Sequence, residues 1–261
     1  MSGKFQLDLS KKFPALPHAP IIEAVLHWQA AASLKLDQAA LQRKLTDSFP
    51  KYESAPQHNI ETALSGSPQG MELKQSTNWD GFRLTRKEND QPAFICQFKR
   101  SGLVVSRLAP YKDWEEFESE ALRFWDAFVE IGQPTEIARL STRYISQIAV
   151  NSISEVQDYI DIGEEPLAAI GVSADGFFYQ NTLNLADLPY KINLVRTVQP
   201  LKQSSAPLSL IVDIDVGTTD NIAIADFAAV PQRLKELRFI KNKVFFTLMK
   251  DAETKFGEKK S

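Results

Sequence analysis

The sequence predicts an α+β protein in which antiparallel sheets carry helices packed on one face. Short runs with a two-residue apolar repeat alternate with longer runs at helical spacing, and the order of these runs occurs twice. Apolar residues make up 43% of the 261 residues, which is enough to build a core. We therefore expect a duplicated β-α-β-β-β-α unit, in residues 1–134 and again in residues 135–261, packed together as one body.

The first unit begins with a strand over residues 21–29, whose alternate positions are apolar: Ile22, Ala24, Leu26 and Trp28. A helix then runs from Asp37, which can cap it, to Pro50, which ends it. Residues 51–70 are rich in Ser, Pro, Gln and Gly and are expected to form a loop, which can include a short irregular strand, before a weak strand over residues 71–75. Turn residues then separate three strands, over residues 82–87, 93–99 and 103–108.

A long helix closes the first unit. Asp113 is placed to cap it, and Glu116 follows three residues later, as in a capping box. Apolar residues then recur at helical spacing as far as Ile131, and Gly132 and Pro134 end the run. The aromatic residues of this helix are expected to cover the sheet.

The second unit repeats the order. We expect a strand over residues 137–150, a short helix over 152–162, and a loop or a further helical turn over 164–171. Three strands follow, over residues 177–183, 190–198 and 208–216. A long helix over 226–256, started or broken by Pro231, ends the unit before a frayed tail.

The charge and the cysteine content exclude several classes. A formal net charge of -3 argues against a protein that coats nucleic acid or an anionic membrane. Cys96 is the one cysteine, so neither an intramolecular disulfide nor a four-cysteine zinc site can form. The N-terminus lacks the apolar run of a signal peptide, and no stretch reaches the roughly 18 apolar residues of a membrane span. We expect a cytoplasmic protein.

Sequence motifs for common cofactors and catalytic groups are missing. The three histidines, His18, His27 and His58, lack the spacing of metal ligands. The glycine-rich loops that hold phosphates are absent, as is the Gly-x-Ser-x-Gly motif of serine hydrolases. Cys96 is in phase with Phe94 and Phe98, as expected of a buried, inert thiol. We expect no metal and no cofactor.

Polar residues on the first strand of each unit are the main site candidates. Glu23 and His27 come from one unit, and Arg139 and Arg143 from the other. If the two strands are central and neighbouring, these four side chains cluster, and Glu23 comes near Arg143. They then form either a structural ion-pair network or a ligand cleft in which arginine anchors an anion.

Asp213 and Asp215 share one face of a later strand, roughly 6–7 Å apart. They form a second candidate centre, for a cation or for acid and base roles. A solvated or salt-bridged strand face accounts for the same pattern.

A nucleic-acid surface is a further alternative. Basic residues in residues 82–108 are interleaved with phenylalanines, a combination that binds single strands through phosphate contacts and stacking. The candidates are Arg83, Arg86, Arg100 and Arg107. The phase of the phenylalanines points them toward the core instead, and the acidic chain weakens the local field.

Three segments resemble a sporadically distributed bacterial family of about this length. They are Leu-Pro-His-Ala-Pro-Ile-Ile-Glu-Ala from Leu16, Arg-Tyr-Ile-Ser-Gln-Ile from Arg143, and the helix from Leu237 to Phe256. Family members open with Leu-Pro-x-Ala-Pro-Ile/Leu-x-Glu and carry Arg-Tyr-x-Asn-x-Ile at mid-chain, where this chain has Ser146. The resemblance implies a bacterial cytoplasmic protein with a shared fold, and it assigns no catalytic residue.

The sequence therefore favours a non-enzymatic module that binds another protein or a second copy of itself. Its support is the absence of catalytic motifs. The first alternative is a small-ligand protein or enzyme that uses Glu23, His27 and Arg143. The second is a nucleic-acid binder that uses the basic strands.

Overall fold

The computed structural model describes residues 4–33, 37–67, 70–163, 170–172, 174–201, 207–226 and 228–258. The first half forms β1 (Ile21–Gln29), α1 (Gln38–Ser48), β2 (Glu53–Ser67), β3 (Gly70–Glu88), β4 (Gln91–Lys99), β5 (Gly102–Leu108) and α2 (Trp114–Gly132). The second half forms β6 (Glu136–Ile137), β7 (Arg139–Val150), α3 (Ile153–Val156), β8 (Phe178–Asn184), β9 (Tyr190–Pro200), β10 (Leu208–Thr218), β11 (Ile222–Ala223), α4 (Ala229–Leu248) and α5 (Ala252–Phe256). The predicted α+β class is confirmed.

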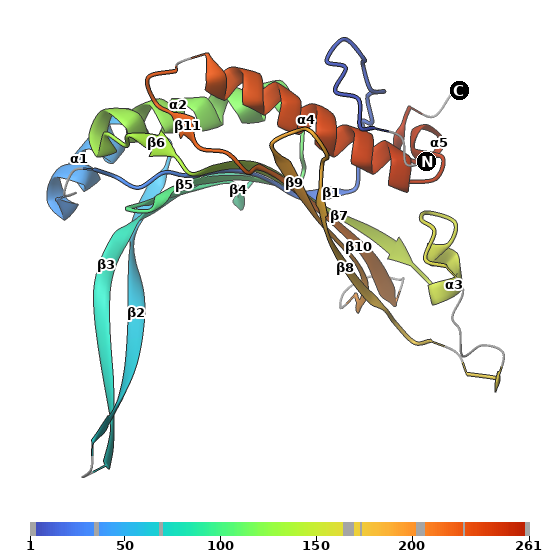
Figure 1. Ribbon diagram of the computed structural model, residues 1–261, viewed down its shortest axis with the longest axis horizontal. Coiled ribbons are helices and arrows are strands. Elements are labelled where there is room, and N and C mark those ends of the chain that lie inside the picture. Colours follow the sequence, from blue (N-terminus) through green and yellow to red (C-terminus); the bar gives the residue numbers. More distant parts are fainter. Residues whose placement is uncertain are drawn as a thin grey trace.

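β1 and β7 pair at the centre of a nine-stranded antiparallel sheet, with the order β2-β3-β4-β5-β1-β7-β10-β9-β8. β6 and β11 form a separate two-stranded sheet. Figure 1 shows the large sheet bent into an arch, with α2 and α4 along its outer side. The β2–β3 hairpin and the strands β8 to β10 form the two arms. We call the side of the sheet away from α2 and α4 the inner face.

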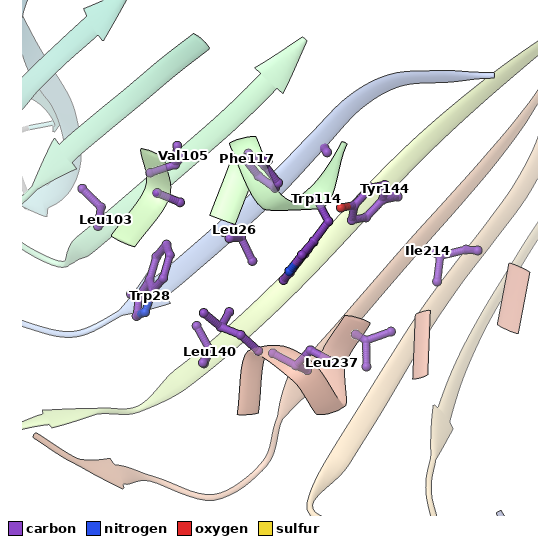
Figure 2. Close-up of a cluster of buried hydrophobic side chains, with 14 of the residues drawn as sticks. Leu26, Trp28, Leu103, Val105, Trp114, Phe117, Leu140, Tyr144, Ile214 and Leu237 are labelled. Atoms are coloured by element: carbon purple, nitrogen blue, oxygen red, sulfur yellow. The ribbon is translucent and has the colours of Figure 1, made fainter. Parts of the chain in front are cut away.

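The core lies between the sheet and the two long helices. In β1, Ala24, Leu26 and Trp28 are fully buried, whereas the residues between them are partly accessible on the inner face. Figure 2 shows Leu26 and Trp28 gathered with residues of other strands and of both long helices, among them Leu140 of β7 and Leu237 of α4. The two-residue repeat of the sequence therefore assigned the side chains of β1 to the correct faces.

α2 begins where the sequence predicts. The Asp113 carboxylate accepts a hydrogen bond from the backbone N–H of Glu116 at 2.7 Å, which satisfies a free amide of the first turn. Trp125 of α2 stacks on Trp28 of β1, with ring centroids 5.5 Å apart. Within the described residues, no helix combines the length and the apolar character needed to cross a bilayer.

The segment expected to be a loop, residues 51–70, instead belongs to a long hairpin. β2 pairs with β3 from Glu53 to Ser67, and the residues of β2 up to Ile60 are exposed or only partly buried. The hairpin leaves the sheet as an arm, as Figure 1 shows, so water reaches both of its faces and neither needs an apolar repeat. Pro56 is compatible with β2 because an edge strand has one side without a strand partner.

Two helices are shorter than expected. The predicted helix over residues 226–256 is divided, because α4 ends at Leu248 and α5 begins at Ala252. At the break, the backbone N–H of Lys250 donates to the carbonyl of Tyr159 at 2.7 Å, a tertiary contact that local sequence does not encode. The helix expected over 152–162 is limited to the short α3, and residues 164–169 of the following segment lie outside the described residues.

The packing of α2 predicts the effect of one truncation. Phe124 is fully buried, and its ring stacks on Phe49 with centroids 4.1 Å apart. We expect Phe124→Ala to lower the free energy of unfolding by about 3–5 kcal/mol, because the neighbouring rings cannot fill the cavity. Urea denaturation measures this change. Arg43→Ala, on the exposed side of α1, is the control and should change stability by less than about 0.5 kcal/mol. An unchanged stability of Phe124→Ala would show that the helix face is wrongly assigned.

Candidate functional site

The six residues predicted for a ligand site all lie on the inner face of three adjacent strands. They are Glu23 and His27 on β1, Arg139 and Arg143 on β7, and Asp213 and Asp215 on β10. β7 is the middle strand of the three, and its register places Arg143 opposite both Val25 and Asp215. The two predicted centres are therefore one cluster.

Both arginines of this cluster already have carboxylate partners. Arg143 donates from Nε and Nη2 to the two oxygens of Asp213, at 2.8 and 2.5 Å, and Arg139 donates to Asp215 at 2.8 Å. The predicted proximity of Glu23 to Arg143 does not produce an ion pair, because Glu23 lies opposite Leu108 and Ile145. A structural ion-pair network explains this geometry better than an anion anchor does.

Two other titratable residues singled out from the sequence are held in their neutral forms. Burial lowers the pKa of His27, and the charge of Arg139 lowers it further, against the opposing effect of Asp215. Burial also raises the pKa of the Cys96 thiol, which keeps it protonated and unreactive. Within the described ranges, no group of three or more His, Cys, Asp or Glu side chains could hold a metal ion.

The arginines considered for nucleic-acid binding do not all lie on one face of the sheet, and nucleic-acid binding stays a prediction. They are Arg83, Arg86, Arg100 and Arg107. Arg107 is only 3% exposed on the helix side of the sheet and pairs with Glu88 at 3.0 Å. Arg86 lies on the same side and also pairs with Glu88, at 3.1 Å, whereas Arg83 is on the inner face. Alternation along the strands therefore separates them.

The Arg143–Asp213 pair predicts a coupled effect on stability. We expect Arg143→Ala to lower the free energy of unfolding by roughly 1–2 kcal/mol. The half-exposed Arg143 contributes little by itself, but its removal leaves the mostly buried Asp213 carboxylate unpaired. The double variant Arg143→Ala/Asp213→Asn should regain part of this loss, because it no longer buries an unpaired charge. Urea denaturation of the two single variants and the double variant measures the coupling. Additive effects would contradict a direct pair.

A larger hollow lies on the opposite side of the sheet, between β7, α4 and the N-terminal segment (residues 9–20). This cavity has a volume of about 1500 Å³. Phe13 of the N-terminal segment packs on Phe239 and Phe246 of α4, in each case with ring centroids 5.4 Å apart. The backbone N–H of His18 donates to the carbonyl of Phe256 at 3.0 Å. These contacts hold the N-terminal segment against the helices as one wall of the cavity.

Lys241 of α4 lines the cavity and has no carboxylate within 4.0 Å among the described residues. Its Nζ lies 3.9 Å from the centre of the Tyr144 ring and donates to Oδ1 of Asn242 at 2.5 Å. Burial lowers the pKa of Lys241 to about 7, and the charge of Arg238 acts in the same direction. Part of the side chain is still accessible. The amine therefore changes between its protonated and neutral forms near neutral pH, whereas an exposed lysine stays protonated there.

Three hydroxyl groups line the same cavity. Tyr111 and Tyr144 share a hydrogen bond of 2.9 Å, and Tyr144 is also labelled in Figure 2. Burial raises the pKa of both tyrosines, to about 12 for Tyr111, so both are protonated at neutral pH. One hydroxyl of the pair keeps a proton that it can donate to a ligand. The buried Ser146 side chain has no hydrogen-bond partner in the described part of the chain.

Basic side chains outnumber acidic ones around the cavity, although the chain as a whole is acidic. The basic ones are Lys11, Lys12, Lys112, Lys235, Arg238 and Lys241. The acidic ones are Asp113, Glu115, Glu253 and Glu258. Arg238 is paired with Glu115 at 3.0 Å, whereas Lys241 is not paired with any of these acids. The cavity is thus a local excess of positive charge beside a tyrosine pair, which suits an anion.

Lys241 was not among the residues singled out from the sequence, because the terminal helix carries an apolar stripe. Lys241 lies four residues after Leu237 and three before Val244, so it occupies the apolar stripe itself. A lysine in an apolar stripe was the available signal. It is a weak one, because lysines commonly bury the aliphatic stem and extend the amine into water.

The lowered pKa of Lys241 predicts how stability depends on pH. The unfolded chain keeps this lysine protonated up to its ordinary pKa of 10.5, so the native state gains stability as the pH rises from about 7 to 10.5. We expect Lys241→Met to be more stable than wild type below about pH 7, and the difference to shrink as the pH approaches 10.5. Urea denaturation across this range measures the difference. A difference that is constant with pH would contradict the lowered pKa.

Comparison of the chain with protein families, with curated proteins and with solved structures gives no match. The functional assignment therefore depends on the chemistry of the residues described above. Of the two clusters, the inner-face network already pairs both of its arginines with carboxylates, whereas Lys241 at the cavity has no carboxylate within 4.0 Å among the described residues. We take the cavity as the candidate functional site.

Proposed function

We propose that this protein binds a small organic anion, with a carboxylate or phosphate group and an apolar part, in the cavity beside Lys241. The observation that carries the proposal is the Lys241 amine, which lines the cavity and has no carboxylate within 4.0 Å among the described residues. An ammonium that loses hydration without gaining a counterion is unfavourable, and Lys241 has only the Asn242 amide oxygen and the Tyr144 ring as described partners. A bound anion supplies the missing charge and favours the protonated amine.

Neutral donors around the lysine complete an anion site. The Tyr111–Tyr144 pair has one proton free to donate, and Ser146 offers a hydroxyl without a described partner. Carboxylate and phosphate oxygens accept several hydrogen bonds at once, so an ammonium and two hydroxyl donors suit either group. Lys241 then provides charge, and the hydroxyls fix the orientation.

The remaining walls indicate that the ligand is organic. Trp114, Phe239, Phe245 and Phe246 line the cavity together with Leu16. Small-molecule sites combine mostly apolar walls with a few placed polar groups, and their volumes are typically about 300–1,000 Å³. A cavity of about 1500 Å³ has room for an anion with an apolar ring or chain. An inorganic ion alone would leave most of these walls without contact.

The three segments on which the family resemblance depends all reach this cavity. Leu16 and Ile21 come from the first segment, Tyr144 and Ser146 from the second, and Lys241 from the third. Arg143, in the same motif as Tyr144, points to the inner face instead. We propose that these motifs are linked by a shared ligand site rather than by separate structural roles.

We also propose that the fold arose by duplication of one unit. Strands β5, β4 and β3 follow β1 outward in the sheet, and β10, β9 and β8 follow β7 outward on the other side. α2 follows the first set in sequence and α4 the second. This order repeats about the β1–β7 pair, where an approximate twofold axis would lie. The ligand cavity is lined by both units, since Tyr111 and Trp114 come from the first and Tyr144 and Lys241 from the second.

Calorimetric titration with benzoate and with phenyl phosphate as probes tests the anion site. We expect Lys241→Met to weaken binding at least about tenfold, because it removes the charge that meets the anion. Above about pH 7, the binding enthalpy should change with the ionisation enthalpy of the buffer, since Lys241 takes up a proton on binding.

Lys235→Met is the matched control. Lys235 lies on the same helix and at the same cavity, but its side chain is exposed, so its loss should change affinity by less than about threefold. Equal affinity of wild type and Lys241→Met would contradict the role of Lys241. If neither probe binds at about 10 mM, which corresponds to less than about 3 kcal/mol of binding free energy, the anion site itself is wrong.

A further inference from the structure

β8 is a terminal strand whose outer edge is open. It pairs with β9 on one side and with no described strand on the other. All of its residues, Phe178 to Asn184, are exposed. Three large apolar side chains are among them: Phe178 is 64% exposed, Tyr179 40% and Leu183 45%. Open apolar edges are uncommon, because they pair readily with other strands.

The opposite edge of the sheet has features that discourage pairing, and β8 does not. β2 contains Pro56, which cannot donate a backbone hydrogen bond, and Glu53, whose charge resists burial. The sequence of β8, Phe-Tyr-Gln-Asn-Thr-Leu-Asn, has neither proline nor charge. A strand without charge can pair with a copy of itself and bring no like charges together.

The backbone of β8 shows which groups are available. The N–H of Leu185 donates to the carbonyl of Tyr190 at 3.1 Å, and the N–H of Val198 donates to the carbonyl of Phe177 at 3.4 Å. Backbone N–H and C=O groups alternate in direction along a strand. Those of the odd-numbered residues of β8 therefore point at β9. Even-numbered residues, from Phe178 to Asn184, therefore point their N–H and C=O groups outward.

We infer that two copies of this chain pair antiparallel through β8, across a twofold axis at Asn181, and join their sheets into one. In this register Phe178 lies opposite the partner's Asn184, and Gln180 lies opposite the partner's Thr182. All four of these residues point their backbone groups outward, so each can exchange two hydrogen bonds with its opposite. A register shifted by one residue would set outward-pointing groups against inward-pointing ones.

The same register matches the exposed side chains. Tyr179 lies opposite the partner's Leu183, at a position without backbone hydrogen bonds, where side chains approach most closely. The twofold axis repeats this contact, so the two apolar residues of each copy are covered together. Asn181 meets its own copy at the axis; its Oδ1 already accepts a hydrogen bond from Arg196 at 3.0 Å, and its amide N–H groups can donate to the partner's Asn181.

The second copy is the occupant that these features favour. A different protein would need a strand matched to this pattern, whereas β8 itself already has the uncharged, apolar sequence that fits. A twofold contact also closes on itself and stops at two copies, because it uses the free β8 edge of each copy. A seven-residue strand pair buries little surface, so we expect a dissociation constant in the micromolar range. This contact gives the expected interaction module a specific partner.

Sedimentation velocity from about 1 to 200 µM, spanning the expected micromolar range, tests the dimer. Tyr179→Glu and Leu183→Lys should each weaken the dimer at least about tenfold. Each variant places a charged side chain opposite an apolar one, and the twofold axis repeats this unfavourable contact. The double variant Tyr179→Glu/Leu183→Lys should dimerise again, since it sets a carboxylate opposite an ammonium at both contacts. An equimolar mixture of the two single variants should also form a dimer.

Met71→Glu is the matched control, because Met71 is 79% exposed on the other arm of the arch. It should leave the dimer unchanged, and the circular dichroism and melting temperature of every variant should match wild type. A wild type that is monomeric at 200 µM overturns the inference. A dimer that is indifferent to both single variants, or a double variant that stays monomeric, overturns it as well.

Discussion

The antiparallel pairing of β1 with β7 is the constraint on which the rest of the structure depends. It joins the two halves of the sheet and sets which side chains meet the helices. A slip of one residue would exchange Leu26 and Trp28 for Val25 and His27 at the core, and the same slip in β7 would turn Tyr144 away from the cavity. The large apolar residues of β1 and the aromatic residues of α2 together hold the register.

Much of the fold follows from periodicity, and its failures have physical causes. β1 and β7 are each buried on one face, so a two-residue repeat predicts them, and α2 is capped by Asp113 as its sequence indicates. The β2–β3 hairpin has water on both sides near Ile60, so its sequence resembles a loop. The end of α4 is set by a distant contact at Lys250, which no local pattern predicts.

The inner-face residues and the Lys241 cavity also differ in how far local sequence predicts them. The inner-face residues were found because alternation along one strand places them, although their partners depend on a strand far along the chain. Arg143 therefore pairs with Asp213 rather than with Glu23. Lys241 was missed because its position in the helix is apolar, and only the enclosure by β7 and the N-terminal segment makes its amine unusual. Enclosure is a property of tertiary structure, so sequence patterns report it poorly.

The N-terminal segment has a consequence for the rate at which a ligand leaves. Its contacts include the packing of Phe13 on α4, the packing of Leu16 on the core, and backbone hydrogen bonds at His18 and Pro20, and it lies outside the large sheet. Local opening of such a segment requires far less free energy than unfolding of the sheet. The residence time of a bound anion is then set by the release of a short stretch of chain, and affinity and exchange rate can change independently. Substitutions at Phe13 would alter how long a ligand stays without changing Lys241 or the hydroxyl groups that meet its charge.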